Sequence, residues 1–247
     1  MVEFCVFLGG VMKKHGVSFG RAKTDYNAAP VTFGPFTIPG IAGSAITEPA
    51  GVIGGGQIGY NWQLSPIWVA GIEADIQASG EKDSITITNS FSQTLAVAAP
   101  APPTVTGTGV INYETKIDWF GTVRARIGYL FGDGGAVLAY LTGGLAYGRV
   151  GVDGTGTVSG TETPGSIPFS ITHTIGHSQV NTGWTVGTGT EGKLLIPGWT
   201  YKIESLYMTL GSLDNNDRPP IPAGGQIHTH TSFRDYIVRA GLNYQFH

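Results

Sequence analysis

Short segments in which apolar and polar side chains alternate recur along the whole chain, and they constrain its fold more than any other feature. In the segment 67–78, Ile72 and Ile76 lie on one face of an extended strand, and Glu73 and Asp75 lie on the other. Charges in mid-strand opposite an apolar face favour a strand that borders lipid on one side. A length of about ten residues is also typical of strands that cross a membrane.

The alternating segments and the connections between them predict one all-β domain over residues 1–247. We expect an antiparallel transmembrane β-barrel of about eight strands, with short periplasmic turns and long extracellular loops. The first strand lies within 3–26, and the others are expected at 51–62, 67–78, 115–130, 136–150, 181–191, 198–210 and 234–246. The long loops are expected at 27–50, 79–112, 151–180 and 211–232.

Composition excludes several other classes of protein. No stretch approaches the roughly 18 consecutive apolar residues of a membrane helix, so a membrane protein of this sequence must cross with strands. The net charge of −3 leaves no basic excess for nonspecific binding of nucleic acid. Cys5 is the only cysteine, which excludes an intramolecular disulfide and a cysteine metal cluster. A soluble barrel or sandwich remains an alternative, although aromatic residues at the strand ends favour the membrane interface.

The charged residues of the strands are expected to face the interior of the barrel. Counted from the adjacent turns, Glu73 should lie at the depth of Arg124, and Lys202 and Glu204 close to that of Arg239. Opposite charges at one depth should pair, because an unpaired buried charge costs several kcal/mol. The predicted lumen charge network consists of Glu73, Asp75, Lys116, Asp118, Arg124, Arg126, Lys202, Glu204 and Arg239.

Several strand sequences together resemble the alphaproteobacterial outer-membrane immunogenic proteins, a porin-related family of eight-stranded barrels that includes surface antigens and haemin-binding proteins. The matching stretches are Gly54–Trp62, Gly71–Ile76, Trp119–Tyr129, Tyr140–Gly148, Gly183–Gly187, Lys202–Tyr207 and Val238–Phe246. The resemblance implies a location in the Gram-negative outer membrane, with contacts to its lipid and lipopolysaccharide. It also implies haemin or a host ligand as candidate partners at the loops.

The last stretch resembles the C-terminal signal that the barrel-assembly machinery reads. Arg239, Gly241, Tyr244 and Phe246 carry this resemblance, and the family normally ends at the phenylalanine, whereas His247 follows here. The other end departs from a secretory signal, because Glu3 precedes the apolar stretch and the lysines come after it. We therefore expect that a signal peptide is not visible in the chain as it stands.

No motif for catalysis or cofactor binding stands out, so the predicted function is a non-catalytic surface-interaction barrel of the cell envelope without a cofactor. Two alternatives remain: a narrow porin-like channel for small solutes, and a lipid-modifying outer-membrane enzyme. Weaker candidate groups are each better explained as solvated loop residues. These are His228 with His230 for a metal or haem, Asp214–Asp217 for Ca²⁺, and His173 and His177 beside Ser170 and Ser178 for catalysis.

Overall fold

The computed structural model describes residues 2–9, 18–33, 36–94, 102–132, 135–217 and 226–246, and the regular elements within them are all β-strands. In that part of the chain, no helix is long and apolar enough to span a bilayer. The strands are β1 (Val2–Gly9), β2 (Ser18–Ala28), β3 (Val31–Phe33), β4 (Phe36–Ile38), β5 (Ile41–Thr47), β6 (Ile53–Gln63), β7 (Trp68–Thr94), β8 (Thr104–Phe131), β9 (Val137–Thr163), β10 (Ile167–Lys193), β11 (Trp199–Asp217) and β12 (Ile227–Phe246).

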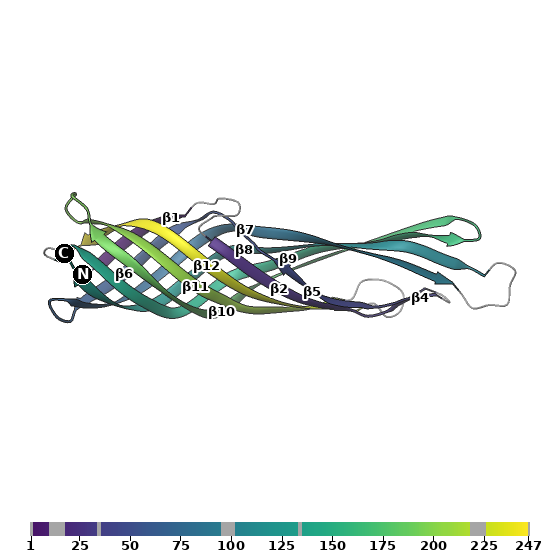
Figure 1. The fold of residues 1–247 in the computed structure, drawn as a ribbon, viewed down its shortest axis with the longest axis horizontal. Helices are drawn as coiled ribbons and strands as arrows, with labels where there is room; N and C mark the ends of the chain where they lie inside the picture. The colour runs from purple at the N-terminus through teal and green to yellow at the C-terminus, as the bar shows by residue number, and fades with distance from the viewer. Residues whose placement is uncertain are drawn as a thin grey trace.

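The strands of the main sheet pair antiparallel, mostly in chain order. The order is β1-β6-β7-β8-β9-β10-β11-β12-β2-β5, and β1 also pairs with β12. Leu8 of β1, for example, has Gly54 of β6 as its partner on one side and Ala240 of β12 on the other. The pairings that start at β1 therefore return to β1. Figure 1 shows these strands winding obliquely around one axis at the end of the molecule that holds both termini.

The prediction of four long loops is wrong for most of their residues. The segment 79–112 belongs largely to β7 and β8, and 151–180 continues β9 and β10 to a turn at 164–166. The segment 211–232 likewise extends β11 and β12, and 27–50 contains β3, β4 and β5. The segments 79–112 and 151–180 are rich in Thr, Ile and Val, which favour strands even where the alternating partners are polar.

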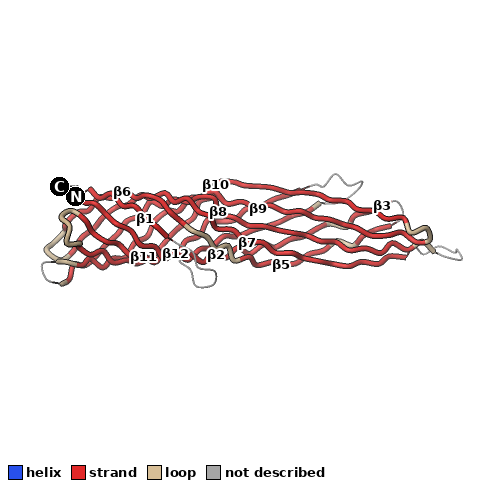
Figure 2. The backbone as a smooth tube through the Cα atoms, turned by 90° about the horizontal axis from the view of Figure 1, so that it is seen from above, coloured by secondary structure: helices blue, strands red, loops and turns tan. Residues whose placement is uncertain are grey.

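Beyond the ring of pairings, the strands continue as a distal extension (Figure 2), in which the ladder between β10 and β11 ends. The β10–β11 pairing reaches only to Thr185 and Met208, whereas β10 stays paired with β9 as far as Ile167. On the other side, β5 pairs with β2, and no ladder joins it to β7 in the described part of the chain. The connection that follows β5 contacts β7 through a bridge between Ala50 and Lys82 and a hydrogen bond from the amide of Glu48 to Asp83. The extension therefore consists of β7-β8-β9-β10 facing β11-β12-β2-β5.

A β-bulge on β8 reverses which side chains face inward. The register shifts between Ile117 and Trp119, so that Asp118 is the extra residue. Phe120, which follows the bulge, and Ile117, which precedes it, are both buried, at 0% and 1% exposure. The strict alternation predicted for 115–130 is therefore wrong before the bulge: Ile117 points inward and Lys116 outward. A bulge adds one residue to one strand, and a pattern with period two cannot continue through it.

A second irregularity lies on β11, where the register shifts between Thr209 and Ser212. Gly211 adopts a φ of +63° there, a left-handed conformation that glycine reaches without the steric cost other residues meet. A third shift separates Ala78 from Glu81 on β7. These irregularities lie near the boundary between the ring and the distal extension.

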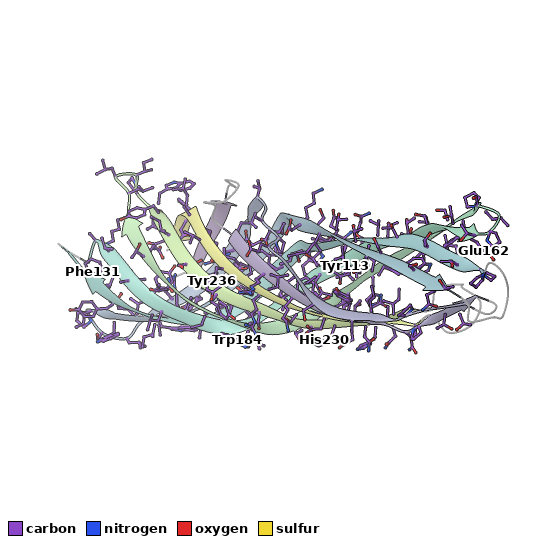
Figure 3. All side chains as sticks on the ribbon, turned by 45° about the vertical axis from the view of Figure 1, so that its right-hand side comes forward. Tyr113, Phe131, Glu162, Trp184, His230 and Tyr236 are labelled. Carbon is purple, nitrogen blue, oxygen red and sulfur yellow. The ribbon has the colours of Figure 1, made fainter. Side chains whose placement is uncertain are left out.

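Outward-facing aromatic side chains form two rows around the ring. The proximal aromatic row, near the termini and the short connections, consists of Tyr60, Trp62, Trp68, Tyr129, Trp199 and Tyr244. The distal aromatic row consists of Trp119, Tyr147, Trp184, Tyr207 and Tyr236. In Figure 3, Phe131 marks the proximal end, Trp184 and Tyr236 lie farther along the axis, and Glu162 lies at the far end of the extension.

The spacing of the two rows matches the thickness of a membrane. Tyr236 and Tyr244 lie eight residues apart on β12, and Trp119 and Tyr129 lie ten apart on β8. At about 3.3 Å per residue and a tilt of about 45°, the rows are roughly 19–23 Å apart, close to the apolar band of outer-membrane barrels. Between the rows, no outward position whose side chain the structure describes carries a charge.

Candidate functional site

A network of buried charges crosses the interior between the two aromatic rows. Alternation on β7 and β8 directs Glu73, Asp75, Arg124 and Arg126 inward, and β11, β12 and β10 add further members. Glu73 is the register partner of Arg124, and Glu204 that of Arg239, as counting from the turns predicts. The lumen charge network, as the structure defines it, consists of Glu73, Asp75, Arg124, Arg126, Glu191, Lys202, Glu204 and Arg239, each at most 4% exposed.

The contacts of the arginines extend across the interior instead of following neighbouring strands. Arg124 donates to Glu73 at 3.1 Å, to Asp75 at 3.0 Å and to Glu204 at 3.3 Å. Arg239 of β12 reaches Asp75 of β7 at 2.8 Å and Glu204 at 2.7 Å. Because β1 and β6 separate β12 from β7 in the sheet, the Arg239–Asp75 pair bridges the lumen.

Lys202 and Arg126 complete the network toward the proximal end. Lys202 donates to Glu73 at 2.7 Å and lies 3.1 Å from Glu204. Arg126 contacts Glu73 at 2.6 Å and Glu191 at 3.3 Å. The eight members comprise four acids and four bases, so the network is electrically balanced at neutral pH.

Two of the predicted members, Lys116 and Asp118, lie outside the network. Lys116 pairs with Asp153 at 2.6 Å, and this hydrogen bond is the main cause that raises the pKa of Lys116 above its ordinary value. Asp118 pairs with Arg149 at 3.4 Å, and both side chains are substantially exposed. The bulge at Asp118 explains both corrections, because it turns the preceding residues to the opposite face.

Sequence reasoning missed Glu191 as a member of the network. Glu191 lies an even number of residues from the inward residues Thr185 and Gly189 on β10, so its side chain points to the same face of the strand. This alternation is the signal that could have identified it. Glu191 also accepts a hydrogen bond from Thr200 at 2.7 Å. It lines a cavity of about 550 Å³ at the proximal end, together with Asn61, Lys193 and other residues.

An apolar layer fills the interior on the distal side of the network, and the sequence analysis did not predict it. Its members come from β2, β6, β8, β9, β11 and β12. Each is no more than 5% exposed: Ala22, Ile53, Tyr113, Ile117, Phe120, Ala146, Val150, Val152, Leu206, Met208, Leu210, Leu213, Phe233 and Ile237. The two layers together pack the lumen from the proximal charges to the start of the extension.

The weaker candidate groups lie on strands instead of loops. His228 and His230 are on β12, where their Nδ1 atoms lie 2.6 Å from Asn216 and Asp214 of β11. His173 and His177 are on β10. Among the residues that the structure describes, no three His, Cys, Asp or Glu side chains lie close enough together to hold a metal ion.

Comparison with known proteins identifies the family. A family model described as an outer membrane protein beta-barrel domain matches residues 14–246, nearly the whole chain. The chain belongs to this outer-membrane β-barrel family. Its place in the cell is therefore the outer membrane.

Relatives of this outer-membrane barrel carry corresponding names. It is 35% identical to the 31 kDa outer-membrane immunogenic protein of Brucella melitensis over 206 residues, 83% of this chain and 71% of that protein. It is 32% identical to the 22 kDa outer membrane protein of Rhizobium leguminosarum bv. viciae over 162 residues, 65% of this chain and 54% of that one. The resemblance to alphaproteobacterial outer-membrane immunogenic proteins is confirmed.

The outer membrane protein OprG from Pseudomonas aeruginosa aligns over 99% of this chain and 96% of its own, with 11% identity and a TM-score of 0.43.

The residues of the predicted assembly signal lie on β12, and their side chains point to both faces of the strand. Arg239 points inward and belongs to the lumen charge network, whereas Tyr244 points outward and stacks edge-on against Trp199 at 5.5 Å. Gly241 pairs with Phe7 of β1 on one side and with Lys202 of β11 on the other. The backbone of Phe246 pairs with Val2, while its side chain and His247 lie outside the described part.

Proposed function

We propose that this chain forms an eight-stranded transmembrane barrel with a closed lumen, which presents its distal extension outside the cell as a non-catalytic contact surface. The ring is formed by β1 and β6 to β12, with β1 pairing with both β6 and β12. The single observation that carries the proposal is the balanced lumen charge network, because its eight members engage each other across the interior.

The size of the ring supports a closed interior. Eight strands enclose a space that side chains just fill, whereas aqueous channels need roughly 16–18 strands. Arg124, Arg239 and Phe120 are among the largest side chains of the interior, and each is at most 1% exposed. The apolar layer adds a second packed level, in which Ile117, Phe120 and Phe233 are each at most 2% exposed.

The lengths of the connections support the orientation. Between β6 and β7 only residues 64–67 intervene, between β8 and β9 only 132–136, and between β10 and β11 only 194–198. Outer-membrane barrels keep their short turns in the periplasm and their long segments outside the cell. The proximal end would then face the periplasm, and the extension would reach on the order of 40 Å of strand beyond the membrane.

Two alternatives make different predictions. A narrow channel needs a continuous path of water past Arg124 and through the apolar layer, and both regions are densely packed. A lipid-modifying enzyme needs a nucleophile and a base at the rim of the membrane. His173 is on β10 and lines an apolar cavity of the extension instead.

Planar-bilayer recording of the purified protein tests the closed lumen. We expect no large, persistent conductance steps from the unmodified barrel. The variant Arg124→Ala/Arg126→Ala removes two of the three cations that contact Glu73 and one of the two that contact Asp75, and leaves only Lys202 and Arg239 beside them. We expect this variant to be less stable and to admit ions. Lasting openings of nanosiemens size in the unmodified protein would contradict the proposal, and cleavage of lipid A by the purified barrel would contradict its non-catalytic part.

A further inference from the structure

Six positively charged residues of the described ranges face outward in one zone around the barrel. Eleven Lys and Arg residues fall in the described part of the chain. Four belong to the lumen charge network, and Lys193 lies at the proximal end. The other six face outward directly beyond the distal aromatic row, and we call them the cation belt: Arg21, Lys23, Lys82, Lys116, Arg149 and Arg234.

The position of the belt relative to the aromatic row is set by alternation along the strands. On β12, Arg234 lies two residues beyond Tyr236 on the same face. On β9, Arg149 lies two residues beyond Tyr147. Tyrosine and tryptophan rings collect at the level of lipid headgroups, so the next outward position meets the headgroups themselves.

Within the belt, Arg21 of β2 and Arg234 of β12 are direct register partners. Partners of this kind have Cα atoms about 4.5–5.5 Å apart, and like charges directly opposite each other are destabilising. Their inward neighbours Ala22, Phe233 and Asp235 are buried, which places both guanidinium groups on the outer surface. No carboxylate in the described ranges forms an ion pair with either of them. Two adjacent guanidinium groups with this geometry suit one doubly charged phosphate group.

The rest of the belt is partly neutralised, which distinguishes the arginine pair. Lys23, on the next outward position of β2, contacts Asp25 at 3.1 Å. Lys116 pairs with Asp153, and Arg149 with Asp118. Lys82 is the register partner of Lys116 and repeats the like-charge arrangement on the other side of the barrel. The belt as a whole is therefore cationic, and its least neutralised point is the Arg21–Arg234 pair.

We infer that Arg21 and Arg234 bind a phosphate group on the headgroup of an outer-leaflet lipid, with the remaining belt adding weaker attraction. The partner is a phosphorylated glycolipid of the outer membrane, whose acyl chains lie against the apolar band while its phosphates meet the arginines. Basic residues at a membrane surface attract anionic headgroups in this way. The inference rests on the membrane placement proposed above, because only that placement brings the belt to the headgroups.

The test compares two forms of one lipid on the intact, folded barrel. The full chain is reconstituted in nanodiscs of phosphatidylcholine, and bound lipid A is counted by native mass spectrometry with either bisphosphorylated or dephosphorylated lipid A. We expect the phosphorylated form to bind roughly tenfold more tightly, and Arg21→Gln/Arg234→Gln to abolish that preference. Lys193→Gln removes a cation at the opposite end and should retain it. Folding of each variant is checked by its heat-dependent shift on electrophoresis.

Three results would overturn the inference: equal binding of both lipid forms to the unmodified protein, a preference that survives in the double variant, or displacement of lipid A by an equal concentration of inorganic phosphate. The first comparison needs no variant, so it decides the matter even if the double variant fails to fold. Bilayer recording of the same preparation distinguishes failure of the headgroup site from failure of the closed lumen. Silent bilayers without a lipid preference contradict only the headgroup site, and conductance with an intact preference contradicts only the closed lumen.

Discussion

Glu204 shows at the scale of one residue how the interior of this barrel is held together. It accepts from Arg124, Arg239 and the hydroxyl of Tyr140, and lies 3.1 Å from Lys202. The side chain is completely buried. A buried ion pair adds little net stability compared with a well-packed apolar pair, but removing one partner leaves the other charge in a dry interior. The network therefore tolerates loss of single members poorly.

Glu204→Ala is accordingly expected to destabilise the barrel by about 3–5 kcal/mol, because three buried cations lose a shared acceptor. Urea unfolding in lipid vesicles, followed by tryptophan fluorescence, measures the change. Asp153→Ala is the matched control, because it also removes a carboxylate from an ion pair, but one that is largely exposed to water. The control should lose no more than about 1 kcal/mol. Equal losses in both variants would argue against the buried network.

At the scale of the strand, the bulge on β8 decides which residues meet the interior. Before it, Tyr113, Thr115 and Ile117 face inward; after it, Phe120 and Arg124 do. The apolar layer depends on the first set and the lumen charge network on the second. One extra residue thus separates two chemically different layers along a single strand.

Ile117→Ala should cost about 2–5 kcal/mol, because it leaves a cavity in the packed layer. Lys116→Ala, one position away on the same strand, should change stability by less than about 1 kcal/mol, since it removes only a surface ion pair. Both values come from urea unfolding in vesicles. A larger effect at Lys116 than at Ile117 would mean that the strand continues in the uninterrupted register that alternation alone predicts.

The apolar band of the strands makes a separate prediction. Ile72 of β7 is 52% exposed about midway between Trp68 of the proximal aromatic row and the level of Trp119 of the distal row, where it would face lipid. Ile72→Arg should impair folding into vesicles by about 2–4 kcal/mol, the cost of a cation near the midplane. Ser90→Arg, at an exposed position of the same strand in the distal extension, is the control and should fold normally. Normal folding of both variants would place the membrane elsewhere.

At the scale of the whole molecule, the barrel and its extension are one continuous set of strands in two surroundings. Figure 1 shows β7, β8, β9 and β10 running without a break from the twisted ring into the extension. There the ladder between β10 and β11 ends at Thr185, beyond which Asn181 still donates to the carbonyl of Ser212, and no ladder joins β5 to β7 in the described part of the chain. The surface that the proposed topology places outside the cell is therefore built of strands in the described part of the chain.

Labelling of intact cells tests this placement. In a Cys5→Ser background, cysteines introduced at Ser90 and Ser159 of the extension should react with a membrane-impermeant maleimide. A cysteine at Leu195, a fully exposed position in the connection between β10 and β11, should react only after the outer membrane is permeabilised. The reverse pattern would invert the proposed topology.

The local sequence was sufficient for several features that depend on alternation within one strand. It predicted the strands in 67–78 and 234–246, the inward direction of Glu73 and Arg239, and the pairing of Glu73 with Arg124, since parity and turn position are properties of neighbouring residues. It also allowed the family to be recognised. The prediction that Lys116 faces inward was wrong because it assumed uninterrupted alternation along the strand, and a bulge interrupts that alternation.

Other features were decided only by the tertiary structure. The continuation of β7 to Thr94 depends on β8 pairing beside it, and the apolar layer forms where side chains from separate strands converge inside the ring. The opposition of Arg21 and Arg234 likewise joins positions more than 200 residues apart in the chain. Alternation determines which side chains of one strand share a face, but the register between strands determines which side chains become neighbours. That register is set by hydrogen bonding across the sheet.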